Sequence, residues 1–412
     1  MSLTGQVRWQ TPLATQDEAG TSGAGPLAVG GVAVFAEDGT VHGLRLTSGR
    51  PAWSYSVGQP VVGMWQWHAL VVVLSGNVGD GVPLGSDGRL IGLDAATGAV
   101  RWRLPLPKGS TGLAGPPVAT ADGGLAMAGW TGPLLMVNMA DGSIRWRSGD
   151  GSGSGAVAAA DGLVFLSNGT GVTAYDDRTG AQRWTATGSE VMPPLQLAGG
   201  LLLVTDDTPS GVGSVLTAIT PATGRIAWRF HANVTLMVSA ADPAGGVAVA
   251  ASFAGRIFLL DPGTGRLRWQ AHTVLDAGPL FTSAGLIEIE GAEGSGPVRI
   301  VDRDAADGRI DWQDTLSAPD TSGGVGYLAG PLLQDGQLAL VLGIAVRHGQ
   351  PTPLSAYRLD TGSLAWRVTL PENAVVSPAL VSAPGPGVLL QPALPVSGCT
   401  GPPVFGGLSC GV

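Results

Sequence analysis

Residues 93–102 read Leu-Asp-Ala-Ala-Thr-Gly-Ala-Val-Arg-Trp, and residues 259–269 repeat the pattern as Leu-Leu-Asp-Pro-Gly-Thr-Gly-Arg-Leu-Arg-Trp. Both stretches end in the element Thr-Gly-x-x-x-Trp, in which the first position is always Thr, Ser or Asp. The element occurs nine times and accounts for nine of the twelve tryptophans. Its glycine and tryptophan positions are Gly5 and Trp9, Gly49 and Trp53, Gly98 and Trp102, Gly142 and Trp146, Gly180 and Trp184, Gly224 and Trp228, Gly265 and Trp269, Gly308 and Trp312, and Gly362 and Trp366.

The spacing of the element predicts the architecture. Successive tryptophans lie between 38 residues (Trp146 to Trp184) and 54 residues (Trp312 to Trp366) apart, a period near that of a four-stranded β-propeller blade. We therefore predict an all-β protein, a single-ring β-propeller of four-stranded antiparallel blades. Residues 1–412 are expected to form one domain, with the tail 367–412 pairing with residues 1–9 so that both termini complete one blade. Complete Trp-to-Trp units number eight, whereas counting the strands of the tail gives nine blades, and both numbers stay open.

The segments between the elements read as strands. Continuous apolar runs occur at Val32–Phe35, Leu70–Leu74, Leu163–Leu166 and Leu201–Val204, each bounded by turn residues. Such runs are too short for helices and are typical of strands that are buried on both faces. No stretch has a sustained helical period.

The element itself has a mechanical explanation. A glycine after Thr, Ser or Asp suits a turn that needs a positive φ, and the preceding side chain can bond the local backbone. The chain then reverses and places the tryptophan on the outer strand, where an indole can wedge between neighbouring blades and donate its N–H to a carbonyl. We interpret the nine glycines and nine tryptophans as a structural motif.

Residues 93–102 and 259–269 resemble the tryptophan-docking repeat of PQQ-type β-propellers, and the resemblance extends over essentially the whole chain. That superfamily includes quinoprotein alcohol dehydrogenases, the outer-membrane assembly scaffold BamB, and sensor domains of some bacterial Ser/Thr kinases. Because its members have unrelated functions, the resemblance implies the architecture and leaves the activity open.

Composition excludes some functions. The net charge of −9 argues against binding to nucleic acid or to an anionic membrane. There is no run of 18 apolar residues, so no transmembrane segment is expected. Met1-Ser2-Leu3 lacks the features of a signal peptide, and we expect that a leader or anchor is missing from this sequence. A disulfide between Cys399 and Cys410 would indicate an extracytoplasmic setting; two free thiols in a cytoplasmic protein are the alternative.

Few residues outside the motif are candidates for chemistry. Trp65 and Trp67 are two residues apart and lie on the same face of a predicted first strand. They are weak candidates for an aromatic surface that binds a cofactor, and packing between blades is the plainer interpretation. The third tryptophan outside the motif is Trp130. The series Asp302, Asp304 and Asp307 looks like a Ca²⁺ loop but has the wrong spacing, with Gln313 in place of the final Glu. We predict no metal site and no catalytic residue.

The absence of a recognisable catalytic set favours a protein that is not an enzyme. We predict a monomeric, extracytoplasmic scaffold of the BamB type that binds a protein partner through its longer loops, such as 75–87, 319–326 and 347–353. A PQQ-dependent oxidoreductase, with PQQ and Ca²⁺ as cofactors, is one alternative. Against it, such enzymes use adjacent cysteines, which Cys399 and Cys410 are not. The extracellular sensor domain of a larger receptor or Ser/Thr kinase is the other alternative.

Overall fold

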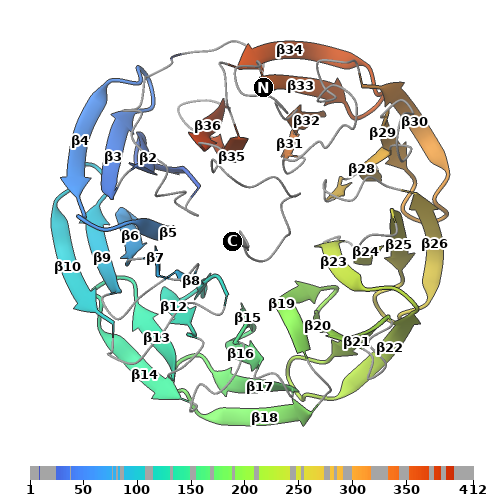
Figure 1. Cartoon of the computed structure of the whole chain (residues 1–412), viewed down its shortest axis with the longest axis horizontal. Helices are drawn as coiled ribbons and strands as arrows, with labels where there is room; N and C mark the ends of the chain where they lie inside the picture. The colour runs from blue at the N-terminus through green and yellow to red at the C-terminus, as the bar shows by residue number, and fades with distance from the viewer. Residues whose placement is uncertain are drawn as a thin grey trace. The chain divides into compact units, whose positions relative to one another are not determined.

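The structure is a computed structural model that describes 21 stretches of the chain: residues 9, 25–37, 39–76, 78–79, 82–83, 88–106, 115–129, 133–148, 155–167, 171–187, 191–207, 213–241, 247–251, 255–272, 279–282, 285–290, 299–316, 333–342, 352–370, 375–381 and 387–393. Within these stretches every regular element is a β-strand. The chain forms two compact units, and Figure 1 labels their strands. The first unit comprises residues 7–195, 222–224 and 377–412, and the second comprises residues 1–6, 196–221 and 225–376.

The first unit contains four four-stranded antiparallel sheets, in each of which the strands pair in chain order. The first sheet consists of β1 (Leu27–Val29), β2 (Val32–Glu37), β3 (Thr40–Arg45) and β4 (Pro51–Ser56). The second consists of β5 (Val61–Trp67), β6 (Leu70–Ser75), β9 (Arg89–Asp94) and β10 (Val100–Pro105), with the hairpin β7 (Val78–Gly79) and β8 (Val82–Pro83) inserted. The third consists of β11 (Val118–Ala119), β12 (Gly124–Met127), β13 (Leu134–Asn138) and β14 (Ile144–Ser148). The fourth consists of β15 (Val157–Ala160), β16 (Leu163–Ser167), β17 (Gly171–Asp176) and β18 (Gln182–Thr187).

The second unit holds the next four sheets, which have the same strand order. The fifth sheet consists of β19 (Val191–Ala198), β20 (Leu201–Asp207), β21 (Ser214–Ile219) and β22 (Ile226–Ala232). The boundary between the units falls inside β19, so that this sheet belongs to the second unit from Gln196 onward. The sixth consists of β23 (Leu236–Ala241), β24 (Val247–Ala251), β25 (Arg256–Leu260) and β26 (Leu267–His272). The seventh consists of β27 (Leu280–Phe281), β28 (Leu286–Glu290), β29 (Arg299–Arg303) and β30 (Ile310–Thr315). The eighth consists of β31 (Leu333–Asp335), β32 (Leu338–Leu342), β33 (Thr352–Arg358) and β34 (Leu364–Leu370).

A further two-stranded sheet pairs β35 (Val375–Val381) with β36 (Gly387–Ala393). The all-β, four-stranded antiparallel organisation predicted from the repeat is thus confirmed, with eight complete sheets in the described residues. The one-domain organisation and the pairing of residues 367–412 with 1–9 stay predictions, because residues 1–8 and 394–412 lie outside the described part. No helix in the described residues is long and apolar enough to cross a membrane.

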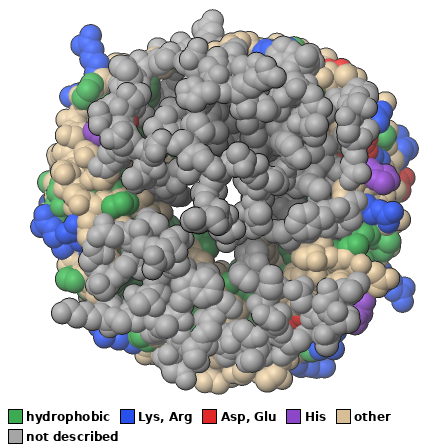
Figure 2. All heavy atoms as spheres, in the orientation of Figure 1, with side chains coloured by type: hydrophobic (Ala, Val, Ile, Leu, Met, Phe, Trp, Pro, Cys, Tyr) green, Lys and Arg blue, Asp and Glu red, His purple; other side chains and the backbone are tan. Residues whose placement is uncertain are grey.

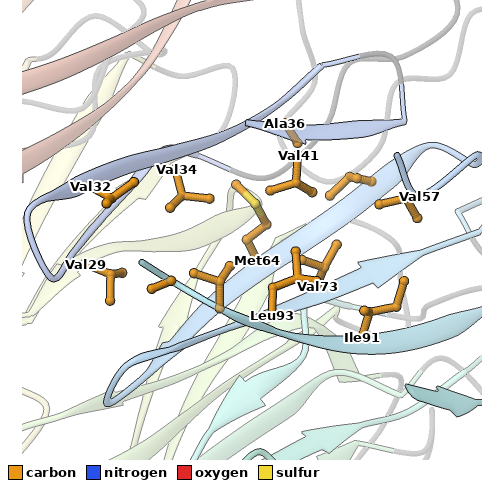
Figure 3. Close-up of a cluster of buried hydrophobic side chains, with 13 residues drawn as sticks. Val29, Val32, Val34, Ala36, Val41, Val57, Met64, Val73, Ile91 and Leu93 are labelled. Carbon is orange, nitrogen blue, oxygen red and sulfur yellow. The ribbon is translucent and has the colours of Figure 1, made fainter. Parts of the chain in front are cut away.

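The hydrophobic core is divided into layers between consecutive sheets of each unit. One layer lies between the first and second sheets and contains Val34, Val41, Met64, Val73 and Leu93 (Figure 3). Equivalent layers join the second to the third sheet and the third to the fourth, and in the second unit the fifth to the sixth, the sixth to the seventh and the seventh to the eighth. The four apolar runs noted in the sequence lie in β2, β6, β16 and β20. Packing on both faces is the physical reason that these strands are continuously apolar.

Candidate functional site

The most regular polar site is the turn that precedes each outer strand. In the second sheet, Asp94 Oδ1 accepts hydrogen bonds from the Thr97 backbone N–H at 3.0 Å and from the Thr97 hydroxyl at 2.8 Å. Arg101 Nη2 donates to Asp94 Oδ2 at 2.7 Å. These bonds hold the pKa of Asp94 well below its usual range, with the Arg101 guanidinium as the largest cause. The carboxylate is therefore committed to the turn.

The same three-residue arrangement recurs in two other sheets. Its members there are Asp176, Thr179 and Arg183, and Asp261, Thr264 and Arg268. The pKa of Asp176 and that of Asp261 are lowered for the same reason, the hydrogen bond from the arginine seven residues later. The Asp176 carboxylate is therefore bound within its turn, as that of Asp94 is.

Each of these turns receives the tryptophan of the preceding unit of the repeat. The Gly98 backbone has a φ of +70°, and a β-carbon added there would lie 2.6 Å from Cε3 of Trp53. Trp53 Nε1 donates to the Ala95 carbonyl at 2.9 Å, three residues before that glycine. Glycine is thus required twice, by the backbone conformation and by the stacked indole.

This docking is repeated along both units. Every glycine of the motif from Gly49 to Gly362 has a φ between +65° and +76° and lies against the preceding motif tryptophan, from Trp9 to Trp312. Tryptophan N–H groups donate to the carbonyls of Leu46, Ala95, Met139, Asp177, Pro262, Ala305 and Leu359. Gly5 lies outside the described residues. Within each unit, the motif joins consecutive sheets through an indole ring and, at these seven carbonyls, one hydrogen bond.

The seventh sheet keeps the docked tryptophan but lacks the Asp-Thr-Arg arrangement of the turn. Asp311 occupies the position that Arg101 has in the second sheet, so the bridge across the turn is replaced by a 2.7 Å contact between Arg309 and Asp311. Arg303 supports the turn instead, by donating to the Gly308 carbonyl at 3.0 Å. The corresponding position is apolar in the second sheet, where it is Leu93.

Arg303 also holds two carboxylates in the interior of this sheet. Its Nε donates to Glu288 Oε1 at 2.5 Å, and its Nη2 donates to Glu290. The Glu288 side chain is fully buried, and its Oε2 has no hydrogen-bond partner among the described residues. Burial raises the pKa of Glu288 to about 7, against the opposing effect of the Arg303 hydrogen bond. Because the side chain is enclosed, this carboxyl can hold a proton near neutral pH but cannot touch a substrate.

A second buried acid lies on the other face of β29. Asp302 is 2% exposed and pairs in register with Trp312. Burial raises its pKa to about 6, and the negative charges of Asp311 and Asp304 add to the rise. Sequence inspection passed over Glu288, Glu290 and Arg303, although charged residues alternating with isoleucine along Leu286–Glu290 were the available signal.

The Ca²⁺-like series does not converge on one point. Asp304 Oδ1 accepts from the Ala306 N–H at 2.7 Å, and Asp307 Oδ1 accepts from the Arg309 N–H at 2.9 Å. Asp302 is instead buried opposite Trp312 in the sheet. Across the described stretches, no three His, Cys, Asp or Glu side chains are grouped so that they could hold a metal ion.

Trp65 and Trp67 pack between the second and third sheets. Both contact the layer that contains Leu125 and Val137. The Trp67 ring lies on Gly123, where an added β-carbon would be 2.5 Å from Cζ2, and it meets His68 edge-on at 4.4 Å between ring centroids. The plainer interpretation, blade packing, therefore accounts for both contacts. Because the Trp67 ring already lies on Gly123 and against His68, it does not fit a second role as a stacking surface for a PQQ ring.

Several sequence candidates fall outside the described residues. These are Trp130, Cys399, Cys410, loop 319–326, and most of loops 75–87 and 347–353. His42 is stacked on Phe35 with ring centroids 5.2 Å apart, and burial lowers its pKa.

The sheets joined by docked tryptophans define a β-propeller with PQQ-type repeats. The family model described as outer membrane protein assembly factor BamB matches residues 2–149 and 131–278, and the chain belongs to this family. No curated protein sequence matches the chain.

Solved structures support the fold. The crystal structure of BamB from Moraxella catarrhalis is similar with 18% identity and a TM-score of 0.51, over 85% of this chain and 97% of that one. The quinohemoprotein alcohol dehydrogenase from Comamonas testosteroni has 15% identity and a TM-score of 0.50, over 89% of this chain and 70% of that one. The computationally designed Ika8 protein has 14% identity and a TM-score of 0.51, over 77% of this chain and 92% of that one. At these identities the likeness concerns the fold alone.

Proposed function

We infer that this protein is a non-catalytic scaffold of the cell envelope that binds a protein partner. The observation that carries the proposal is the match of residues 2–278 to the family described as an outer membrane protein assembly factor. The described polar side chains are consistent with it. The turn groups of the repeat, such as Asp94, Thr97 and Arg101, bond one another, and Glu288 is enclosed.

The proposal is tested by recovering partners from native envelopes. A tagged form of the full chain, expressed at its native level, is cross-linked in cells and purified after solubilisation of the envelope. We expect envelope proteins to co-purify in amounts comparable to the bait, and to be lost when the bait is expressed without export to the envelope. Recovery of the bait alone would refute the scaffold function.

The oxidoreductase alternative is separated by a titration of the purified protein with PQQ and Ca²⁺. A scaffold gives no saturable quenching of tryptophan fluorescence and no dye-linked oxidation of alcohols. Saturable quenching that requires Ca²⁺, together with turnover, would replace the proposal by the enzymatic function.

A further inference from the structure

The outer strands of the fifth and sixth sheets, β22 and β26, expose positive charge in a protein whose net charge is −9. Five arginines lie on or beside them: Arg225, Arg229, Arg256, Arg266 and Arg268. Only two acidic side chains of these sheets are described. Asp206 is buried, and Asp261 is bonded to Arg268 at 2.8 Å. Among the described side chains of these two sheets, arginines therefore outnumber acids.

Histidines and aliphatic side chains share this surface. His231 and His272 occupy the same position in the two strands, three residues after Trp228 and Trp269, and both are exposed. Arg256 is the register partner of His272, so two basic side chains lie side by side on β25 and β26. In Figure 2, blue and purple side chains lie beside green ones along the edge where Figure 1 draws β22 and β26.

Ile226 and Leu267 begin these strands and are 42% and 45% exposed. Large aliphatic side chains with this exposure, next to arginines, favour contact with a ligand that is itself both apolar and acidic. We use the name basic edge for six exposed side chains of β22, β25, β26 and the turn before β26: Ile226, Arg229, Arg256, Arg266, Leu267 and His272.

The basic edge also offers backbone groups. β22 pairs only with β21, and β26 only with β25, so in the described residues each strand is the last of its sheet. The outward row of N–H and C=O groups of such a strand can pair with an added extended chain. Neither β22 nor β26 contains a proline, whereas the outer strands β4 and β10 contain Pro51 and Pro105.

We propose that the basic edge binds an extended segment of the partner protein that carries both carboxylates and aliphatic side chains. The inference rests on the proposed scaffold function and names the chemistry of its partner. Carboxylates of the segment meet Arg229, Arg256 and Arg266, its aliphatic side chains cover Ile226 and Leu267, and its backbone extends β22 or β26.

A short segment fits this surface better than a membrane or a nucleic acid does. Charges act over a Debye length of about 8–10 Å in physiological salt, so a short acidic segment senses the local arginines and little else. An extended anionic surface also meets the rest of a protein with a charge of −9 and is repelled. The exposed apolar groups, Ile226 and Leu267, include no aromatic anchor for a lipid interface.

The test uses the full chain and a fluorescein-labelled peptide of about ten residues that alternates Glu and Val. Fluorescence anisotropy at low salt should show saturable binding. The double variant Arg229→Glu with Arg266→Glu should weaken binding at least tenfold, and a Lys-Val peptide should not bind. The matched control is Arg147→Glu, because Arg147 is exposed and follows Trp146 as Arg229 follows Trp228.

Three outcomes overturn the proposal: no binding of the Glu-Val peptide, equal weakening by Arg147→Glu, or sedimentation of the protein with phosphatidylglycerol vesicles in place of peptide binding. Cross-linking in cells separates this failure from that of the scaffold function. If the double variant captures the same envelope proteins in the same amounts as the wild type, the basic edge is wrong while the scaffold function stands. If the double variant loses the captured proteins while the wild type and Arg147→Glu retain them, the result supports both the basic edge and the scaffold function.

Discussion

Replacing Glu288 by Gln should change how the stability of the protein depends on pH. In the folded protein the pKa of Glu288 is about 7, whereas the ordinary value is 4.5. A raised folded-state pKa means that the folded protein holds the proton more tightly than the unfolded chain does. The stabilisation is therefore complete below about pH 4.5 and is lost as the pH rises through about 7. A tenfold difference in proton affinity is worth about 1.4 kcal/mol, so the full loss is about 3 kcal/mol.

The glutamine side chain of the Glu288→Gln variant stays neutral and cannot take part in this loss. The free energy of unfolding is measured by urea denaturation with tryptophan fluorescence, from about pH 5 to about pH 8. We expect the wild type to lose about 2–3 kcal/mol relative to Glu288→Gln over this range. Asp161→Asn is the control, because Asp161 is exposed in a turn with a φ of 50° that Asn also accepts. A difference curve that is flat, or that favours the wild type as the pH rises, would refute the burial argument.

Two further predictions concern the docking turns. Gly98→Ala should lower the free energy of unfolding by about 2–4 kcal/mol, because the methyl group meets both the positive φ and the Trp53 ring. Gly31→Ala, with a φ of +81° and nothing within 4 Å, should cost only about 1 kcal/mol, and equal losses in urea denaturation would contradict the docking contribution. Asp94→Asn should destabilise by less than about 1 kcal/mol at neutral pH, since its Arg101 bridge is exposed. Because the folded pKa of Asp94 is lowered, this deficit should disappear as the pH falls below its usual titration range; a deficit that persists in acid would count against the bridge.

Much of the fold could be predicted from the repeat. A glycine that precedes a tryptophan by four residues fixes where each chain reversal and each outer strand lie, and the apolar runs fix the inner strands. Local backbone conformation and burial on both faces act on a few consecutive residues, so the sequence displays them directly. The docking turns follow for the same reason, since Asp94, Thr97, Gly98 and Arg101 are close in sequence.

The candidate sites were harder to predict from the sequence than the fold was. Trp65 and Trp67 could be assigned to one strand face, but only the structure shows Trp67 on Gly123 of the next sheet. The basic edge depends on Arg256 and His272 being register partners, which their separation in the sequence does not reveal. Both cases depend on which strands become neighbours.

The sequence by itself determined the repeating unit, the strand order within each sheet and the reason that glycine and tryptophan recur. Only the tertiary structure decided whether the charged side chains of Leu286–Glu290 are buried or exposed. Its alternation of charged residues with isoleucine is typical of a strand with one face in water. Stacked sheets cover both faces, so Glu288 is buried and must share Arg303 with Glu290. Burial of a charge depends on what packs against it from elsewhere in the chain, and no local pattern contains that information.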